Sequence, residues 1–148
     1  MSQLSITEFA DKVGELMPFI MKDFMRAQTE EFYKLKITMP QFFVMEHLFR
    51  AGECRMGDIA KFINVTTAAM TGLVDRIVRE GYAARSSDPD DRRIVKINLT
   101  AKGARVVKEM IERRRQVSIN MFGRISQEER EEYLKILTHL KETMQEQG

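Results

Sequence analysis

The sequence predicts a mainly α-helical fold with one small β-hairpin. Over most of the 148 residues, apolar side chains recur every three or four positions, which is the spacing of amphipathic helices. The spacing changes to strict alternation in residues 94–99, where β-branched residues dominate. A segment rich in Ser, Asp and Pro, residues 86–93, precedes this alternation and predicts a turn. A chain of this length can bury a core without disulfides or metals.

Composition excludes several classes of protein. With 43% hydrophobic and 31% charged residues, the chain has the composition of a soluble globular domain. No apolar run is long enough for a transmembrane helix, and the amphipathic, acidic N-terminus is unlike a signal peptide. Cys54 is the only cysteine and there are two histidines, so neither an internal disulfide nor a zinc site is expected. We therefore expect a cytoplasmic protein with no metal, no cofactor and no membrane partner.

The net charge of +2 is unevenly distributed along the chain. Residues 101–115 hold six basic and two acidic side chains, whereas both ends are slightly acidic. A basic excess in the middle of the chain is a weak indication of a polyanionic partner.

The first two helices are expected over residues 5–34 and from Thr38 to just before Gly52. Pro18 falls inside the first helix and cannot donate to the carbonyl of Gly14, so a kink or a break is expected there. Thr38 and Gln41 form a capping box that opens the second helix.

Residues 56–75 predict a helix-turn-helix. The first of its helices covers residues 56–62 and has the small Ala60 where the second helix would cross it. Asn64 occupies the tight turn, which needs a residue that tolerates positive φ. The second helix runs from about Thr66 to Gly81 and turns an apolar face back onto the first. In a helix-turn-helix the second helix lies in the DNA major groove, although an ordinary corner between two helices is the alternative.

The predicted hairpin follows this motif directly. Its strands are expected at residues 82–85 and 94–99, and its tip carries Arg92 and Arg93. Arginines at such a tip suit the narrow, electronegative minor groove of DNA. The alternative is a charged turn that is merely solvated.

Two long helices complete the chain. Thr100 is expected to cap a helix that runs to about Phe122, and the capping box of Ser126 and Glu129 opens the last one. The first and last helices carry apolar stripes that a single chain would leave exposed, which indicates a homodimer. The stripes consist of Phe9, Val13, Leu16, Ile20, Leu134, Leu137, Leu140 and Met144.

These features together resemble the MarR family of bacterial transcriptional regulators, and the resemblance covers nearly the whole chain. The matching positions are Asp88, Asp91, Arg92, Arg93, Leu99, Thr100 and Gly103. Asp90 departs from the pattern, since many members have arginine there. The resemblance implies a single MarR-like domain over residues 1–148, with a winged helix-turn-helix lobe at 38–100 and dimerisation helices at 1–37 and 101–148. It also implies a homodimer that reads a pseudo-palindromic operator, and a ligand-responsive repressor.

The candidate DNA-binding residues lie on the recognition helix, residues 66–80, and on the wing, residues 86–93. They are Thr66, Thr67, Ala68, Thr71, Arg76, Arg92 and Arg93. The threonines and Ala68 cannot make bidentate base contacts, so Arg92 is expected to matter most. Arg76 can reach a phosphate or pair with Asp75 or Glu80. Arg93 adjoins Asp88 and Asp91 and is expected to pair with one of them.

The resemblance further implies a pocket for a small aromatic effector, where the first two helices meet the long fifth one. Phe42, Phe43 and His47 are the candidate lining residues, although Phe42 also fits the core and His47 the surface. Two alternatives stay open, namely redox sensing through the thiol of Cys54 and a helical interaction module that does not bind DNA. An enzyme is not expected, because the sequence has no Gly-rich phosphate loop, catalytic triad or metal-ligand cluster.

Overall fold

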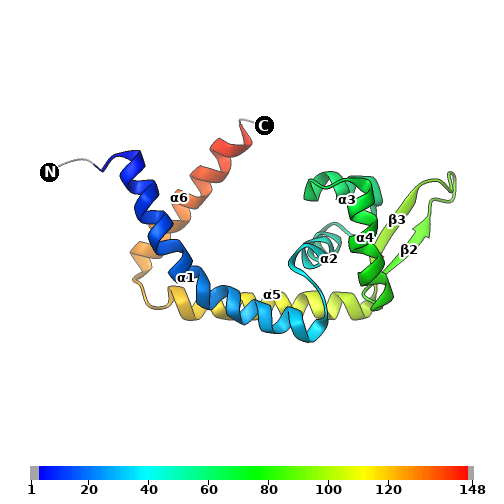
Figure 1. The fold of residues 1–148 in the computed structure, drawn as a ribbon, viewed down its shortest axis with the longest axis horizontal. Helices are drawn as coiled ribbons and strands as arrows, with labels where there is room; N and C mark the ends of the chain where they lie inside the picture. Colours follow the sequence, from blue (N-terminus) through cyan, green and yellow to red (C-terminus); the bar gives the residue numbers. More distant parts are fainter. Residues whose placement is uncertain (1–3, 147–148) are drawn as a thin grey trace. The chain divides into compact units, whose positions relative to one another are not determined.

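The computed structural model describes residues 4–146 and divides the chain into two compact units, one reaching to Arg113 and one starting at Arg114. The elements follow in the order α1 (Ile6–Leu35), α2 (Met39–Ala51), β1 (Cys54–Arg55), α3 (Met56–Ile63), α4 (Thr67–Arg79), β2 (Ala83–Ser87), β3 (Val95–Leu99), α5 (Ala101–Phe122) and α6 (Gln127–Gln145) (Figure 1). The unit boundary falls within α5. The mainly α-helical fold with a small sheet is therefore confirmed. No helix among the described residues is both long and apolar enough to cross a membrane.

Capping residues set where several helices begin. The predicted capping boxes at Thr38 and Ser126 are both present, each closed by the side chain of the residue three positions on. Ser5 forms a third box with Glu8 at the start of α1. Each box satisfies two backbone N–H groups that a helix N-terminus would otherwise leave without a partner.

Pro18 does not break α1, which runs without interruption over its 30 residues. The sequence predicted either a kink or a break at Pro18, and the prediction of a break is wrong. The carbonyl of Gly14 loses its helical partner, but Gly14 is exposed and water can replace that bond.

The sheet has three antiparallel strands in the order β1-β3-β2, so the hairpin carries an additional edge strand that the sequence analysis missed. Ile97 of β3 stands opposite Cys54 on one side and Arg85 on the other. β2 also extends two residues beyond the expected end at Arg85, to Ser87. A strand of two residues shows no alternation, so periodicity could not have revealed β1.

The core lies in the first unit, where α2, α3, α4 and the sheet pack together (Figure 1). Its fully buried side chains are Val44, Met45, Leu48, Ile59, Met70, Val74, Ile77, Ile97 and Val107. In contrast, no residue of α6 is buried, and Phe9, Leu16 and Ile20 of α1 are exposed. The apolar stripes of the terminal helices are thus uncovered within this chain.

Candidate nucleic-acid interface

Helices α3 and α4 form the predicted helix-turn-helix. Asn64 has φ of 59° and its N–H donates to the carbonyls of Ala60 and Lys61, which ends α3 with a left-handed residue. Thr66 then caps α4, because its hydroxyl accepts from the N–H of Ala69 at 3.1 Å. Ala60 is buried at the packed side of α3, as its small size predicted.

The outer face of α4 is polar and exposed at its N-terminal half. Thr66, Thr67, Ala68 and Thr71 are all exposed, while Met70 is fully buried behind them. The hydroxyl of Thr71 donates to the carbonyl of Thr67 at 3.0 Å, which leaves its oxygen as an acceptor toward solvent. The predicted recognition surface is therefore accessible in this chain.

Arg76, further along α4, contacts the end of α1. Its Nε donates to the carbonyl oxygen of Lys36 at 3.1 Å. Asp75, one of the two partners considered for Arg76, pairs instead with Arg85 of β2. The contact to Lys36 joins residues forty positions apart, and nothing in the local sequence pattern signals it.

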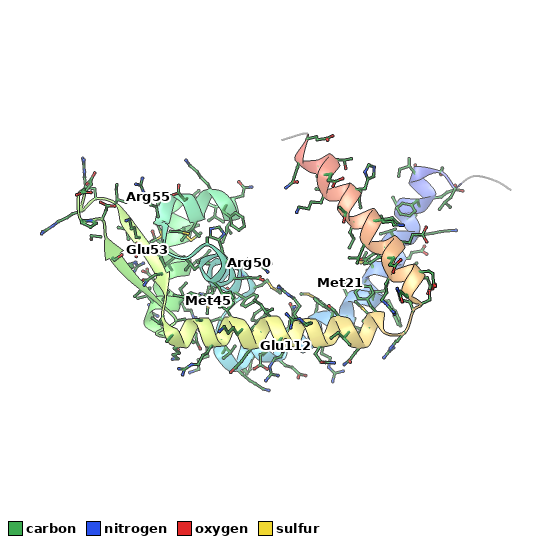
Figure 2. The ribbon with its side chains drawn as sticks, turned by 180° about the vertical axis from the view of Figure 1, so that it is seen from behind. Met21, Met45, Arg50, Glu53, Arg55 and Glu112 are labelled. Carbon is green, nitrogen blue, oxygen red and sulfur yellow. The ribbon has the colours of Figure 1, made fainter. Side chains whose placement is uncertain are left out.

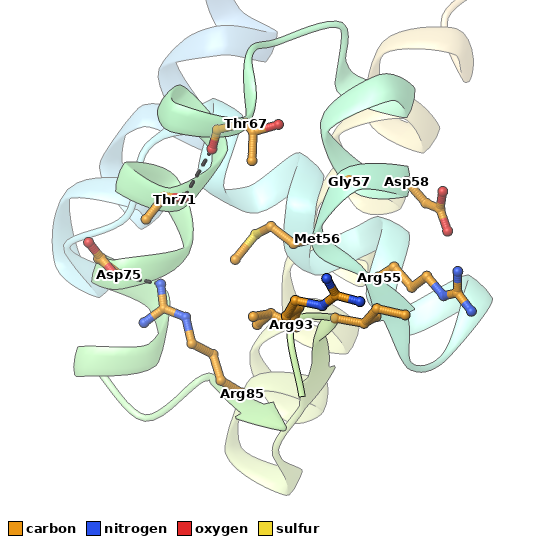
Figure 3. Close-up of a pocket in the computed structure, with 11 residues that line it drawn as sticks. Arg55, Met56, Gly57, Asp58, Thr67, Thr71, Asp75, Arg85 and Arg93 are labelled. Atoms are coloured by element: carbon orange, nitrogen blue, oxygen red, sulfur yellow. Dashed lines mark hydrogen bonds and ion pairs between the residues drawn. The ribbon is translucent and has the colours of Figure 1, made fainter. Parts of the chain in front are cut away.

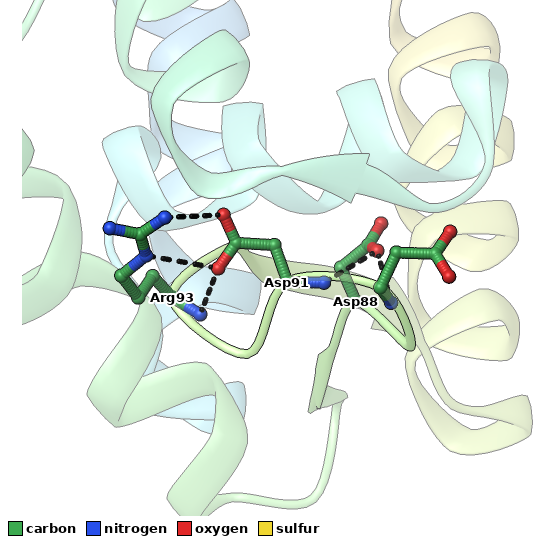
Figure 4. Close-up of polar contacts among 4 residues, drawn as sticks. Asp88, Asp91 and Arg93 are labelled. Carbon is green, nitrogen blue, oxygen red and sulfur yellow. Dashed lines mark hydrogen bonds and ion pairs between the residues drawn. The ribbon is translucent and has the colours of Figure 1, made fainter.

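Carboxylates organise the tip of the wing (Figure 4). One oxygen of Asp88 accepts from the N–H groups of Asp90 and Asp91, at 2.9 and 3.3 Å, and the other pairs with Lys96 at 3.0 Å. Asp91 accepts from Nε and Nη2 of Arg93, at 3.1 and 3.2 Å. The predicted pairing of Arg93 within this turn is thus confirmed, with Asp91 as its partner.

These contacts shift the acidity of both carboxyl groups. The pKa of Asp88 is lowered, first by the backbone N–H of Asp90 and then by the Lys96 side chain. The pKa of Asp91 is lowered chiefly by the guanidinium of Arg93. Arg92, which lies between Asp91 and Arg93 in the sequence, is exposed and makes no hydrogen bond or ion pair within residues 4–146. The wing therefore presents Arg92 as its unpaired cation.

An open hollow of about 590 Å³ separates α4 from the wing (Figure 3). Thr67, Thr71 and Asp75 line it from α4, whereas Arg85 and Arg93 line it from the hairpin. The N-terminal end of α3 adds Arg55, Met56, Gly57 and Asp58. The recognition face and the wing thus share one concave surface.

Sequence reasoning missed two arginines of this surface. Arg55 stands on β1 beside the hairpin, near Glu53 (Figure 2), and is exposed. It was missed because the strand that positions it was missed. Arg85 lay in an expected strand, but its pairing with Asp75 depends on how α4 packs against β2.

The three candidate effector residues occupy different environments. Phe42 belongs to the core, with its ring 5.6 Å from that of Phe32. Phe43 is exposed, and His47 stacks on Phe62 with the ring centroids 4.0 Å apart. None of the three rings lines the hollow between α4 and the wing.

Cys54 lacks the surroundings of a reactive thiol. Its Sγ lies 3.3 Å from the carbonyl oxygen of Gly52, to which it donates. Partial burial, with the nearby carboxylates of Asp58 and Glu53, raises the pKa of this thiol. Reactive cysteines have a lowered pKa, because the thiolate is the nucleophile. In the described part of the chain there is also no cluster of three or more His, Cys, Asp or Glu residues arranged to hold a metal ion.

A helix-turn-helix with an exposed second helix, followed at once by a hairpin with a cationic tip, defines the winged helix-turn-helix class. The model of the MarR family matches residues 37–95, which span the motif and the wing. The chain belongs to this family, as the resemblance implied.

Sequence similarity to known proteins supports the assignment to this family. The chain is 34% identical over 98 residues to the HTH-type transcriptional regulator YwhA of Bacillus subtilis, covering 66% of this chain and 70% of that protein. It is 29% identical over 97 residues to the multiple antibiotic resistance protein MarR of Escherichia coli, covering 66% and 67% of the two chains. These relatives are transcriptional regulators, which are not enzymes.

Solved structures share the fold over most of the chain. A MarR family protein from Bacillus stearothermophilus superposes with a TM-score of 0.80 and 27% identity, over 95% of this chain and 99% of that one. A mutant of Escherichia coli MarR in complex with operator DNA has a TM-score of 0.68 at 22% identity, over 92% and 98% of the chains, and so shows the fold alone.

Proposed function

We propose that this chain is a homodimeric transcriptional regulator that binds double-stranded DNA through α4 and the wing. The observation that carries the proposal is the shared concave surface, in which the exposed threonines of α4 face a hollow lined by Arg55, Arg85 and Arg93. A winged helix-turn-helix contacts DNA in two ways. Its second helix enters the major groove, and its cationic side chains contact the flanking phosphates and the minor groove. This surface offers groups for both kinds of contact.

Each candidate residue has a distinct proposed contact. Thr66, Thr67, Ala68 and Thr71 would touch thymine methyl groups and phosphates in the major groove, since none is long enough for a bidentate base contact. Arg92 is free to enter the minor groove, where the negative potential is strongest. Arg55, Arg93 and the Nη atoms of Arg76 would contribute phosphate contacts.

We assign dimerisation to the terminal helices, residues 1–37 and 101–148, and DNA binding to the lobe at 38–100. The support is the exposure of the apolar stripes, for example 60% at Leu16 and 62% at Leu134. Patches of that kind on one chain usually mark an interface. A twofold dimer would present two wings and two recognition helices to a pseudo-palindromic operator.

Repression in response to a small aromatic effector is the finer part of the proposal. Repression, though not the effector, is supported by the transcriptional repressor MdtR of Bacillus subtilis, which is 27% identical to this chain over 100 residues, covering 68% of this chain and 64% of that protein. Of the three candidate effector residues on α2, Phe43 is exposed and His47 is half-buried, so their rings are the ones that an effector could reach. We also propose that the protein acts in the cytoplasm, where a bacterial DNA target would be found.

Selection of DNA from a random-sequence library by the purified full-length protein tests the proposal, followed by footprinting of the enriched sites. We expect enriched sites with two related half-sites, both protected, about one helical turn apart or a multiple of it. Addition of salicylate, an aromatic acid used as a probe, tests whether an effector releases the protein from the enriched DNA. A helical interaction module would enrich no sequence, and that result would contradict the proposed function.

A further inference from the structure

The C-terminal end of α1 is held by two side chains from the end of the recognition helix. The hydroxyl of Tyr82 donates to the carbonyl oxygen of Leu35 at 3.3 Å. The Nε of Arg76 donates to the next carbonyl oxygen, that of Lys36, at 3.1 Å. Two consecutive carbonyl groups at the end of α1 are therefore bound by Arg76 and Tyr82, which flank the end of α4.

The chain conformation at Lys36 makes these carbonyls available. Lys36 has φ of 56°, so α1 ends there in a left-handed residue and the chain turns away. The last carbonyls of a helix have no partner within the helix and need an external donor. Phe32 and Ile37, on the two sides of this end, are buried in the core and fix this end of α1 against the lobe.

Tyr82 also connects the end of α4 to the start of α5. Its N–H donates to the carbonyl of Ile77 at 2.8 Å, and its own carbonyl accepts from the N–H of Thr100 at 3.1 Å. The ammonium of Lys102 lies 4.9 Å from the centroid of its ring. The ends of α1 and α4 and the start of α5 thus meet at one nearly buried tyrosine.

We propose that Tyr82 and Arg76 are positioning residues, which fix the direction of the recognition helix relative to α1 and thereby the half-site spacing that the dimer accepts. This inference rests on the proposed function, in which α1 belongs to the dimer interface and α4 to the DNA interface. If α1 and α4 are rigidly joined in each subunit, the distance between the two recognition helices of the dimer is fixed. Only operators with one half-site spacing can then contact both recognition helices. The apolar contacts of Phe32 and Ile37 hold the end of α1 against the lobe without these two hydrogen bonds, so the bonds contribute orientation.

The test compares wild type, Tyr82→Phe and Arg76→Lys on one selected operator and on versions with half-sites one base pair closer or further apart. Tyr82→Phe keeps the ring and removes the hydroxyl. Arg76→Lys keeps the charge for a phosphate and removes the Nε donor. Arg79→Lys is the matched control, since Arg79 lies on the same helix, is exposed and has no side-chain hydrogen bond or ion pair within the described residues.

We expect both variants to lose discrimination between the best spacing and its neighbours by about threefold to tenfold, with dimer content and the salt dependence of binding unchanged. Arg79→Lys should keep the preference of wild type. The inference is overturned if wild type binds with a spacing preference that both variants retain, or if they weaken all spacings equally, as loss of a plain phosphate contact or of fold stability would. Failure of wild type to bind any DNA would instead overturn the proposed function, and this inference with it.

Discussion

Asp91 binds the guanidinium of Arg93 with both carboxylate oxygens, while Arg92, the residue between them, has no partner within residues 4–146. The side chain of Arg93 is 91% exposed, so this ion pair contributes little to global stability. Its effect is on the shape of the turn, because a bidentate contact fixes the guanidinium plane. The two neighbouring arginines of the wing thus have different tasks.

Replacement of Arg93 by lysine should disturb the wing, because lysine cannot make the forked contact to Asp91. We expect amide NMR signals of residues 88–94 to shift and broaden, while those of α3 and α4 stay in place. Arg92→Lys is the matched control and should shift only its own signal and those of its immediate neighbours, without broadening the rest of the turn. Equal spectra for Arg93→Lys and wild type would show that Asp91 does not organise the turn.

Arg92→Ala should weaken DNA binding by about 1–3 kcal/mol per half-site, more than any single alanine substitution on the outer face of α4. The reason is that Thr71 can offer only a short side chain, whose hydroxyl proton is already donated to Thr67. Fluorescence anisotropy on a selected operator measures both variants. A larger loss for Thr71→Ala than for Arg92→Ala would mean that the helix, and not the wing, dominates affinity.

The wing contacts of Asp88 and Asp91 should persist well into acid. Both carboxyl groups have a pKa below their ordinary value of 3.8 in the folded wing. Their contribution is therefore fully present above that value and is lost only as pH falls through the lower, folded pKa. An NMR titration of the side-chain carboxyl carbons measures the pKa of each group and checks that both lie below the ordinary value.

Two variants separate the causes of these shifts. Arg93→Met should raise the pKa of Asp91 toward its ordinary value, and Lys96→Met should do so for Asp88. If Arg93→Met leaves the titration of Asp91 where it is, the guanidinium is not the cause.

Gly103→Ala should destabilise the first unit by about 1–3 kcal/mol, the usual cost of overpacking. A Cβ at this position would lie 2.0 Å from the carbonyl oxygen of Tyr82, so the backbone has to move. Gly72→Ala is the control, because a Cβ there meets nothing within 4 Å and should stabilise α4 by about 0.5–1 kcal/mol. Urea unfolding at matched protein concentration measures both, and a neutral Gly103→Ala would contradict the close approach.

Leu137→Asp should convert the proposed dimer into monomers, because it places a charge in the apolar stripe of α6. Leu137 is 43% exposed in the single chain, so the substitution should spare the fold of the chain itself. Lys135→Asp, on the same helix and exposed, is the control and should remain dimeric. Analytical ultracentrifugation decides, and a dimeric Leu137→Asp variant would contradict the assignment of α6 to the interface.

Local signals in the sequence predicted most of the fold. The capping boxes at Thr38 and Ser126 and the left-handed turn at Asn64 depend on side chains within three or four residues, so a short window contains the whole cause. The pairing of Arg93 with Asp91 was predictable for the same reason.

Long-range contacts could not be predicted in this way. Asp75 and Arg85 meet only because α4 packs against β2, and Arg76 reaches Lys36 across forty positions. The edge strand that positions Arg55 is two residues long and has no period to detect. The missed parts of the site are therefore those that depend on tertiary packing.

The salt dependence of binding to a selected operator is the most direct test of whether α4 and the wing bind the DNA backbone. For a DNA-binding dimer, log affinity should fall steeply and linearly with log salt concentration, because each phosphate contact releases counterions. Arg55→Ala removes one proposed phosphate contact per subunit and should reduce the slope by about 2 per dimer. A slope near zero for wild type, with equal retention of unrelated DNA, would mean that the chain does not bind DNA through this surface.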